Sequence, residues 1–436
     1  MDKDIIAVGG FVVLFLLMVL RVPIGISMGL VGVGGFAMVV GQIGPALNIL
    51  ELSPIRAMTN FEFGLVPLFI LMGVVATESG MSTELFTACS KWLGRRRGGM
   101  ALATVAACAG FAAICGSSVA TAATMSNVAL PEMRRLGYPD TLSTGVVAAG
   151  GTLGILIPPS VVLAIYGIIV EQDIAALFMA GLVPGILATF MYMMTVRILG
   201  ALNPAAVPTG EPSTWRERIE SVRGIWAVVL LFLFVIGGIY GGVFTPTEAA
   251  GMGAGGAIII AVARRRLPWP LFVKCFSQTV RTTASVFTIL IGALLFGSFL
   301  AVTQAPQNIT NFLVGLPIGR YGLLTLLLLV YLGLGCVLDA MAMVLLTVPI
   351  VFPVIVKLGF DPIWFGVIIV MAVELALITP PVGMNVFVIK GVIKDTSLKT
   401  IFTGVTPFIF TDVVRLLLLV VFPGIVLFLP RLLGSV

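Results

Sequence analysis

The chain contains no histidine among its 436 residues, and its only cysteines are Cys89, Cys108, Cys115, Cys275 and Cys336. The missing histidine excludes histidine-based catalytic triads, histidine proton relays and histidine-ligated metals. The cysteines include no C-x-x-C pair, so they indicate neither a zinc site nor a disulfide framework. Charged residues make up only 10% of the chain. With no metal-ligand cluster and no pair of nucleophile and base visible, an enzyme is the least favoured class of function.

Apolar residues are abundant instead, at 59% of the chain. Because a membrane span needs about 20 apolar residues, most of the chain is expected to be lipid-buried helix. The sequence therefore predicts an all-α polytopic membrane protein. The start, Met-Asp-Lys-Asp, lacks the basic region and cleavage site of a signal peptide, so we interpret residues 5–20 as a first span that is retained. We expect no separate soluble domain.

Two apolar regions are interrupted by residues that break helices. Gly116-Ser117-Ser118 separates two apolar limbs that are each too short to cross a bilayer comfortably, and a run from Gly154 leads into Pro158-Pro159. Backbone groups freed by such breaks have no water to bond to in lipid, so they persist only where they are buried in protein or line a cavity. Each break is therefore a candidate functional site.

The interruptions recur half a chain later. A shift of 222 positions places Pro131 on Pro353, Gly137 on Gly359, and the first Pro-Pro pair on Pro380-Pro381, which is the only other such pair. Paired interruptions at corresponding positions of two halves are the best sequence indication of a transporter's binding site near the bilayer midplane. Coincidence among 50 glycines and 25 prolines is the alternative interpretation.

The pattern predicts five segments. Residues 1–62 form N-terminal scaffold helices ending in a polar connection, and residues 63–202 form a first repeat with a re-entrant hairpin (100–114 and 119–133) and a broken helix (141–170). A cytoplasmic linker follows at 203–223. Residues 224–281 form scaffold helices and an amphipathic arm, and residues 282–436 form a second repeat with a hairpin (321–337 and 341–356) and a broken helix (363–389).

The basic residues predict the orientation. With the N-terminus outside, 19 of the 25 lysines and arginines fall on the cytoplasmic face, five fall on the other face, and Arg415 is left inside a span. The first hairpin then enters from the cytoplasm and the second from outside, so the repeats are inverted, as an alternating-access carrier requires. This topology accounts for the net charge of +6 without a nucleic-acid partner.

Four motifs together resemble a known family. They are Gly116-Ser117-Ser118-Val119-Ala120-Thr121-Ala122, the run from Gly151 to Ser160, the sequence from Gly242 to Ala250 containing Thr245-Pro246-Thr247-Glu248, and Thr379-Pro380-Pro381-Val382-Gly383-Met384-Asn385. In this order, and with this topology, they are similar to the large membrane subunit of tripartite ATP-independent periplasmic (TRAP) transporters, typified by dicarboxylate and sialate uptake systems. The resemblance covers essentially the whole chain.

The resemblance implies a secondary transporter of the bacterial inner membrane that moves an organic anion inward with sodium ions. It implies two partners, a small four-helix membrane subunit and a periplasmic solute-binding protein. It also implies an elevator-type fold like that of the ion transporter superfamily, in which the hairpins and broken helices move against a fixed scaffold. Since this chain has no extra domain, we expect the small subunit to be a separate polypeptide.

The residues at the breaks suit sodium, which binds several oxygen ligands that unwound carbonyls supply without buried charge. One ion is expected between the first hairpin tip, with Gly116 and Ser118, and the first break, with Gly154 and Pro158. A second is expected between the second tip and the second break, with ligands from Asp339, Ala340, Thr379, Gly383 and Asn385. Simple helix capping is the alternative interpretation of the two serines and of Asp339, and the two roles are compatible.

An anionic substrate group is expected beside the half-helix N-termini, where the helix dipole favours negative charge. The candidate substrate-binding residues are Ser117, Ser118, Pro159, Ser160, Pro381 and Arg281. Arg281 could neutralise a carboxylate, although an interfacial arginine that reaches toward water is the commoner case. Glu374, in an apolar stretch, is interpreted as a hydrogen-bonded supporting residue rather than a proton carrier. Glu248 is interpreted as a helix cap.

Two classes of function remain open. The first is sodium-coupled uptake that depends on a binding protein, and the second is a stand-alone dicarboxylate symporter or proton antiporter of the same architecture. The motif from Thr245 to Ala250 favours the first. Neighbouring genes for a small four-span protein and a secreted binding protein would decide between the two classes.

Overall fold

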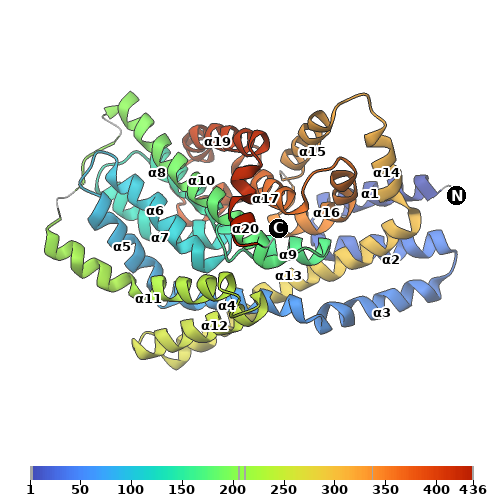
Figure 1. Ribbon diagram of the computed structural model, residues 1–436, viewed down its shortest axis with the longest axis horizontal. Helices are drawn as coiled ribbons and strands as arrows, with labels where there is room; N and C mark the ends of the chain where they lie inside the picture. The colour runs from blue at the N-terminus through green and yellow to red at the C-terminus, as the bar shows by residue number, and fades with distance from the viewer. Residues whose placement is uncertain (1–2, 205–206, 211–212, 336, 435–436) are drawn as a thin grey trace.

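A computed structural model describes residues 3–204, 207–210, 213–335 and 337–434, so Cys336 and part of the expected linker lie outside the described residues. The described residues fold into helices, and eight of these helices are long and apolar enough to cross a membrane. This confirms the prediction of an all-α polytopic membrane protein. Figure 1 shows most of the scaffold helices along the lower edge and the two hairpins on opposite sides of α17 (Pro362–Ile378).

The scaffold helices come from two parts of the chain. The first part contains α1 (Lys3–Val19), α2 (Ile24–Val40), α3 (Ile43–Thr59), the 3-10 turn η1 (Phe61–Gly64) and α4 (Leu65–Glu78), and the second contains α11 (Trp215–Tyr240), α12 (Pro246–Ala263) and α13 (Trp269–Thr303). Helix α13 packs directly on α2. A Cβ atom at Gly292 would lie 2.1 Å from the carbonyl oxygen of Gly25, so this crossing needs glycine.

The first repeat contains a hairpin, a broken helix and a long return helix. They are α6 (Gly99–Cys115) with α7 (Ser118–Arg135), α8 (Asp140–Leu156) with α9 (Val161–Val170), and α10 (Ile174–Leu202). The second repeat has the same order, with α15 (Arg320–Leu334), α16 (Ala340–Lys357), α17 (Pro362–Ile378), α18 (Met384–Val392) and α19 (Leu398–Val421). The amphipathic helix α5 (Met81–Leu93) precedes the first hairpin, and the short α20 (Gly424–Leu432) follows α19.

The repeat expected from the prolines is present in the helix bounds. Shifted by 222 positions, the bounds of α7 coincide with those of α16, and the bounds of α8 coincide with those of α17. Gly137 and Gly359, which follow α7 and α16, both have a positive φ, of 80° and 74°. Both Pro-Pro pairs lie in the breaks between helices. The two halves therefore share one local design.

Helices α8 and α17 lie at the centre of the molecule. Every residue from Ile363 to Ile378 is buried, and so is every residue from Leu142 to Leu156. Helix α19 approaches α8 so closely that a Cβ atom at Gly145 would lie 2.1 Å from the carbonyl oxygen of Gly404. The two broken helices are therefore packed inside the protein, with the scaffold along one side of the molecule (Figure 1).

The helix bounds differ from three of the expected segments. The expected polar connection before residue 63 contains the helix α3, and the expected linker 203–223 contains the start of α11 at Trp215. The boundary expected between residues 281 and 282 falls inside α13, which continues unbroken for 35 residues, because the amphipathic and apolar stretches share one helix. A short helix, α14 (Ala305–Val314), was not expected.

The interpretation of Glu248 as a cap is confirmed. The Thr245 hydroxyl accepts a hydrogen bond from the Glu248 backbone N–H (3.3 Å), and the Glu248 carboxylate accepts one from the Thr245 N–H (2.9 Å). This reciprocal capping box satisfies two of the N–H groups that the start of α12 would leave unpaired.

Candidate functional site

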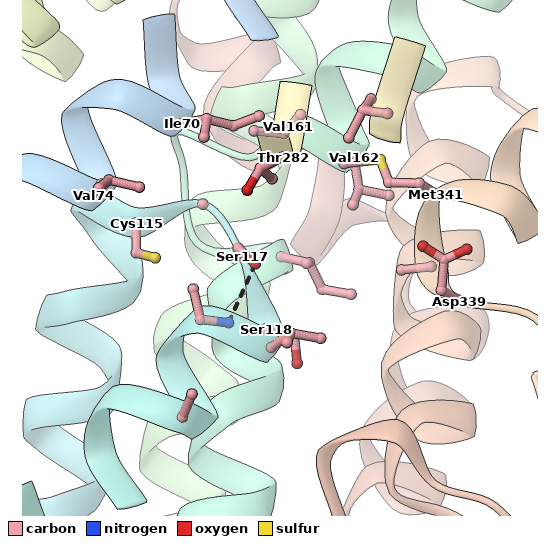
Figure 2. A pocket seen from close by; sticks show the side chains of 18 of the residues that line it. Ile70, Val74, Cys115, Ser117, Ser118, Val161, Val162, Thr282, Asp339 and Met341 are labelled. Carbon is pink, nitrogen blue, oxygen red and sulfur yellow. Dashed lines mark hydrogen bonds between the residues drawn. The ribbon is translucent and has the colours of Figure 1, made fainter. Parts of the chain in front are cut away.

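A cavity of about 350 Å³ lies where the two hairpin tips meet the scaffold. The first tip contributes Gly116, Ser117 and Ser118, and the second contributes Asp339, Ala340 and Met341. Figure 2 shows Ser117 and Ser118 facing Asp339 and Met341 across this space, with Thr282 of α13 pointing into it. The structure thus brings both hairpin tips to one cavity, although they are more than 200 residues apart in the sequence.

The scaffold wall of the cavity comes from α4 and α13. Helix α13 contributes Gln278, Thr282 and Ser285, whose spacing places them on one face of the helix. Helix α4 contributes Glu78, which is ion-paired with Lys274 at 2.7 Å. The sequence analysis missed these residues, although the recurrence of polar residues every three or four positions along an apolar helix was a usable signal.

The first tip is built by a glycine and a helix cap. Gly116 has a φ of 63°, and a Cβ atom there would lie 2.7 Å from the Pro159 carbonyl oxygen. Ser117 is extended, and its Oγ accepts a hydrogen bond from the Ala120 N–H at 3.4 Å, drawn as the dashed line in Figure 2. Ser117 therefore caps α7 and lines the cavity at once.

The tip packs against the first break, as expected. A Cβ atom at Gly154 would lie 2.5 Å from the Ser117 carbonyl oxygen and 2.8 Å from Thr121 Oγ1, so only glycine permits this approach. Ser160 closes the break as the N-cap of α9, because its Oγ accepts from the Leu163 N–H at 3.2 Å and donates to the Ile155 carbonyl. Pro158 and Ser160 are buried and do not line the cavity, so their position favours a structural role.

Asn385 contacts the first hairpin tip, although it was expected among the ligands of the second ion. Its Nδ2 donates to Ser118 Oγ at 2.8 Å and to the Ala148 carbonyl at 3.2 Å, and its Oδ1 lies 3.1 Å from the Ser118 hydroxyl. Both side chains are buried, with 0% of Asn385 and 2% of Ser118 exposed. The start of α18 therefore reaches across to the first hairpin and links the two repeats.

The second tip repeats the capping geometry of the first. Asp339 lies 222 positions after Ser117, and its Oδ1 accepts a hydrogen bond from the Ala342 N–H at 3.1 Å. Asp339 and Ala340 line the cavity, whereas Thr379, Pro381 and Gly383 do not. Thr379 Oγ1 donates to the Leu375 carbonyl of its own helix at 2.5 Å, and Pro381 is exposed. The second break therefore contributes less to the cavity than the sequence analysis expected.

The two charged candidates have different positions. Arg281 is exposed and is not among the residues that line the cavity. Glu374 is fully buried, and its Oε2 accepts a hydrogen bond from Arg415 Nη2 at 2.8 Å, which confirms its interpretation as a hydrogen-bonded residue. The sequence analysis gave Arg415 no role beyond its place inside a span.

The site is rich in uncharged oxygen atoms. Ser118 and Asn385 carry hydroxyl and amide oxygens beside the carbonyls of the first hairpin tip, and Asp339 carries a carboxylate on the opposite side of the cavity. Within the described part of the chain, no group of three or more cysteine, aspartate or glutamate side chains could hold a metal ion. The polar groups of the site are therefore carbonyl, hydroxyl, amide and carboxylate oxygens.

Comparison with known proteins places the chain in a family. The family model described as tripartite ATP-independent periplasmic transporter, DctM component, matches residues 11–425. The chain is 34% identical over 401 residues to the C4-dicarboxylate TRAP transporter large permease protein DctM of Pseudomonas aeruginosa, covering 89% of this chain and 93% of that protein. It is 32% identical over 427 residues to the isethionate TRAP transporter permease protein DctMQ of Oleidesulfovibrio alaskensis, covering 96% of this chain and 65% of that protein.

A solved structure supports the architecture. The crystal structure of the Alcanivorax borkumensis YdaH transporter superposes with a TM-score of 0.62 over 87% of this chain and 89% of that chain, at 17% sequence identity. At this identity the likeness concerns the fold alone, and it confirms the fold of a polytopic membrane transporter. The relatives are named as transporter permeases, which confirms the expectation that the chain is not an enzyme. The chain therefore belongs to the DctM family, the large permease components of tripartite ATP-independent periplasmic transporters.

Proposed function

We propose that this chain carries a small organic anion across the bacterial inner membrane together with sodium ions, by an elevator movement. The anion would be delivered by a periplasmic solute-binding protein, and a small four-helix membrane subunit would complete the permease, with the N-terminus of this chain in the periplasm. The meeting of both hairpin tips and the scaffold at one cavity carries the proposal. A site between two inverted repeats is the arrangement that alternating access needs.

The cavity can bind an anion without a basic side chain. The part of its lining that the structure describes contains no lysine or arginine, but helix α7 begins there at Ser117, whereas the Asp339 carboxylate caps the start of α16. Helix N-termini carry unpaired N–H groups and about half a positive elementary charge, which together favour an anionic group. The hydroxyl and amide groups of Gln278, Thr282 and Ser285 would complete the hydrogen bonds of a carboxylate.

The same geometry supports coupling to a cation. Asp339 places a carboxylate on the cavity that would repel an anionic substrate, so substrate binding is favourable only when positive charge accompanies it. A sodium ion beside Asp339 would offset this repulsion, and a second would bind among the oxygens near Ser118, Gly154 and Asn385. Sodium is here a transported co-substrate that enters and leaves with the anion.

The division of the cavity supports the proposed elevator movement. One side belongs to the hairpins, which pack on the core of α8 and α17, and the other belongs to α4 and α13, which pack with the remaining scaffold. A boundary that runs through the substrate cavity lets one packed group of helices slide against the other without opening either core. We assign the hairpins and broken helices to the moving group.

The relatives support the substrate class and the partners. Their names refer to C4-dicarboxylates and isethionate, which are small organic anions. This chain covers 93% of the first relative and 65% of the second. The remaining third of the second relative would accommodate a small membrane subunit.

Uptake into proteoliposomes that contain the chain and both partners tests the coupling. Uptake should require an inward sodium gradient, and a pH gradient in sodium-free buffer should not replace it. Undiminished uptake under the second condition would refute sodium coupling.

A pair of variants on α13 tests the cavity. Gln278→Ala should raise the half-saturating substrate concentration about tenfold or more, because a lost hydrogen bond to a charged group costs about 1.5–3 kcal/mol. Arg281→Ala, on the same helix and outside the cavity, should leave it unchanged. Equal effects of the two variants would contradict this placement of the substrate.

The stand-alone carrier is the second candidate function, because the hairpin architecture by itself would also serve such a protein. It is tested by omitting the partners. The chain reconstituted alone should not transport at micromolar substrate concentrations, and robust uptake without the partners would favour the stand-alone carrier.

A further inference from the structure

A cluster of charged side chains lies inside the packed core, apart from the cavity. Glu374 of α17 and Arg415 of α19 are 0% exposed, and Asp412 of α19 is 2% exposed. Arg415 Nη2 donates to Glu374 Oε2 at 2.8 Å and to Asp412 Oδ1 at 2.9 Å. Ionisable residues inside a membrane protein are costly and by default indicate function. None of the three lines the cavity.

The cluster continues into the first repeat through two hydroxyl groups. Tyr192 of α10 is fully buried, and its hydroxyl lies 2.7 and 2.8 Å from the two carboxylate oxygens of Asp412. Thr152 Oγ1 of α8 lies 3.1 Å from the Tyr192 hydroxyl. The Thr152 hydroxyl also lies 2.7 Å from the Ala149 carbonyl of its own helix, so its single proton is shared between that carbonyl and the Tyr192 oxygen. The chain of contacts joins α8, α10, α17 and α19.

The cluster holds both broken helices at equivalent points. Thr152 lies six residues before Pro158, and Glu374 lies six residues before Pro380. The 222-residue shift that relates the two repeats therefore places Thr152 on Glu374. One arginine and one tyrosine thus connect the same position of α8 and α17, each just ahead of its break.

The first repeat brings this cluster close to the proposed ion site. Thr152 follows Gly151, where a Cβ atom would lie 3.2 Å from Asn385 Nδ2. Asn385 Nδ2 in turn donates to Ser118 Oγ of the first hairpin. A displacement of α8 at Thr152 would therefore move the surface on which the Ser118 and Asn385 pair rests.

We infer that Glu374, Arg415, Asp412, Tyr192 and Thr152 form a positioning cluster that sets the sodium affinity of the transporter. It fixes α8 against α17 so that the oxygen atoms near Ser118, Asn385 and Gly154 keep the spacing that a sodium ion needs. The cluster touches neither ion nor substrate and acts through the broken helices, as supporting partners of metal ligands do elsewhere. The inference rests on the sodium coupling proposed above.

Three variants leave the charge of the cluster unchanged. Two of them each remove one hydroxyl group, and the third keeps it. Thr152→Val keeps the shape of the side chain but loses the contact to Tyr192, Tyr192→Phe loses the contact to Asp412, and Thr152→Ser keeps the hydroxyl. The control is Tyr166→Phe, which removes another buried tyrosine hydroxyl, bonded to the Pro362 carbonyl at 2.7 Å. All are compared in proteoliposomes with both partners, by sodium titration of uptake and by thermal unfolding.

Thr152→Val and Tyr192→Phe should each raise the half-saturating sodium concentration about threefold or more, and Thr152→Ser should stay within twofold of the wild type. Tyr166→Phe should lower the thermal midpoint and leave sodium dependence unchanged. The inference is overturned if the two cluster variants alter only the thermal midpoint, as the control does. If Thr152→Val does not fold, Tyr192→Phe decides. Wild-type uptake that needs no sodium would instead refute the proposed coupling, and with it the basis of this inference.

Discussion

The contact between Ser118 and Asn385 gives the sharpest test of the site. It joins the first hairpin to the second broken helix, and the two residues lie 267 positions apart in the sequence. Ser118→Ala removes this contact and leaves the Asn385 amide without its nearest partner, which should cost about 1–2 kcal/mol of stability. Asn385→Ala also loses the bond to the Ala148 carbonyl and leaves a small cavity, so about 2–4 kcal/mol is expected.

The double variant should be less destabilised than the sum of the two single variants, by about 1 kcal/mol, because both single variants remove the same hydrogen bond. Denaturant unfolding of the purified protein in detergent measures the three values. Asn127→Ala is the control, since this exposed asparagine of the same hairpin bonds only to the Ala123 carbonyl of its own helix, and its effect should stay within about 0.5 kcal/mol.

Sodium titrations of uptake by the same variants distinguish a role of the two side chains in ion binding from a role in helix capping alone. Ser118→Ala and Asn385→Ala should each raise the half-saturating sodium concentration about fivefold, which corresponds to about 1 kcal/mol. Additive destabilisation with unchanged sodium dependence would refute the reasoning, because it would show that the two side chains neither couple to each other nor support the ion.

The remaining predictions concern packing and acid stability. Gly404→Ala should lower the free energy of unfolding by about 1–3 kcal/mol and so lower the thermal midpoint, because its Cβ atom would lie 1.8 Å from the Thr141 carbonyl oxygen. Gly391→Ala should leave the thermal midpoint unchanged, because its Cβ atom would meet no described neighbour within 4 Å. The hydrogen bond from Arg134 holds the pKa of the Asp395 carboxyl below its ordinary value. Asp395 therefore stabilises the fold at neutral pH and loses this contribution as the pH falls through its lowered pKa, so Asp395→Asn should show a smaller loss of thermal midpoint between pH 7 and pH 3.

The local design of the repeats was predictable from the sequence. Glycine, serine, aspartate and proline act on the backbone within a few residues of their own position, so the breaks after Cys115 and Leu156 and the repeat at 222 positions follow from residue types alone. The capping role of Glu248 is local in the same way, because Thr245 and Glu248 are three residues apart.

Regions of mixed polarity were harder to predict. Residues 43–59 carry charges and a proline yet form α3, and the amphipathic stretch before residue 282 continues into an apolar span as the single helix α13. Helix formation there is supported by packing against neighbours, as where α2 meets α13, which a local pattern does not show.

Only the tertiary structure decided which polar groups meet. Asn385 was assigned to the second break because it lies there in the sequence, but the packing of α18 directs its amide to Ser118 of the first hairpin. In the sequence, Arg415 is only a charge inside a span. The packing of α17 against α19 supplies its partner, Glu374. The choice of partner depends on how helices from distant parts of the chain cross, and buried polar groups in lipid must find whichever partner that crossing presents. The sequence alone determined where the helices break, and the fold determined what faces the breaks.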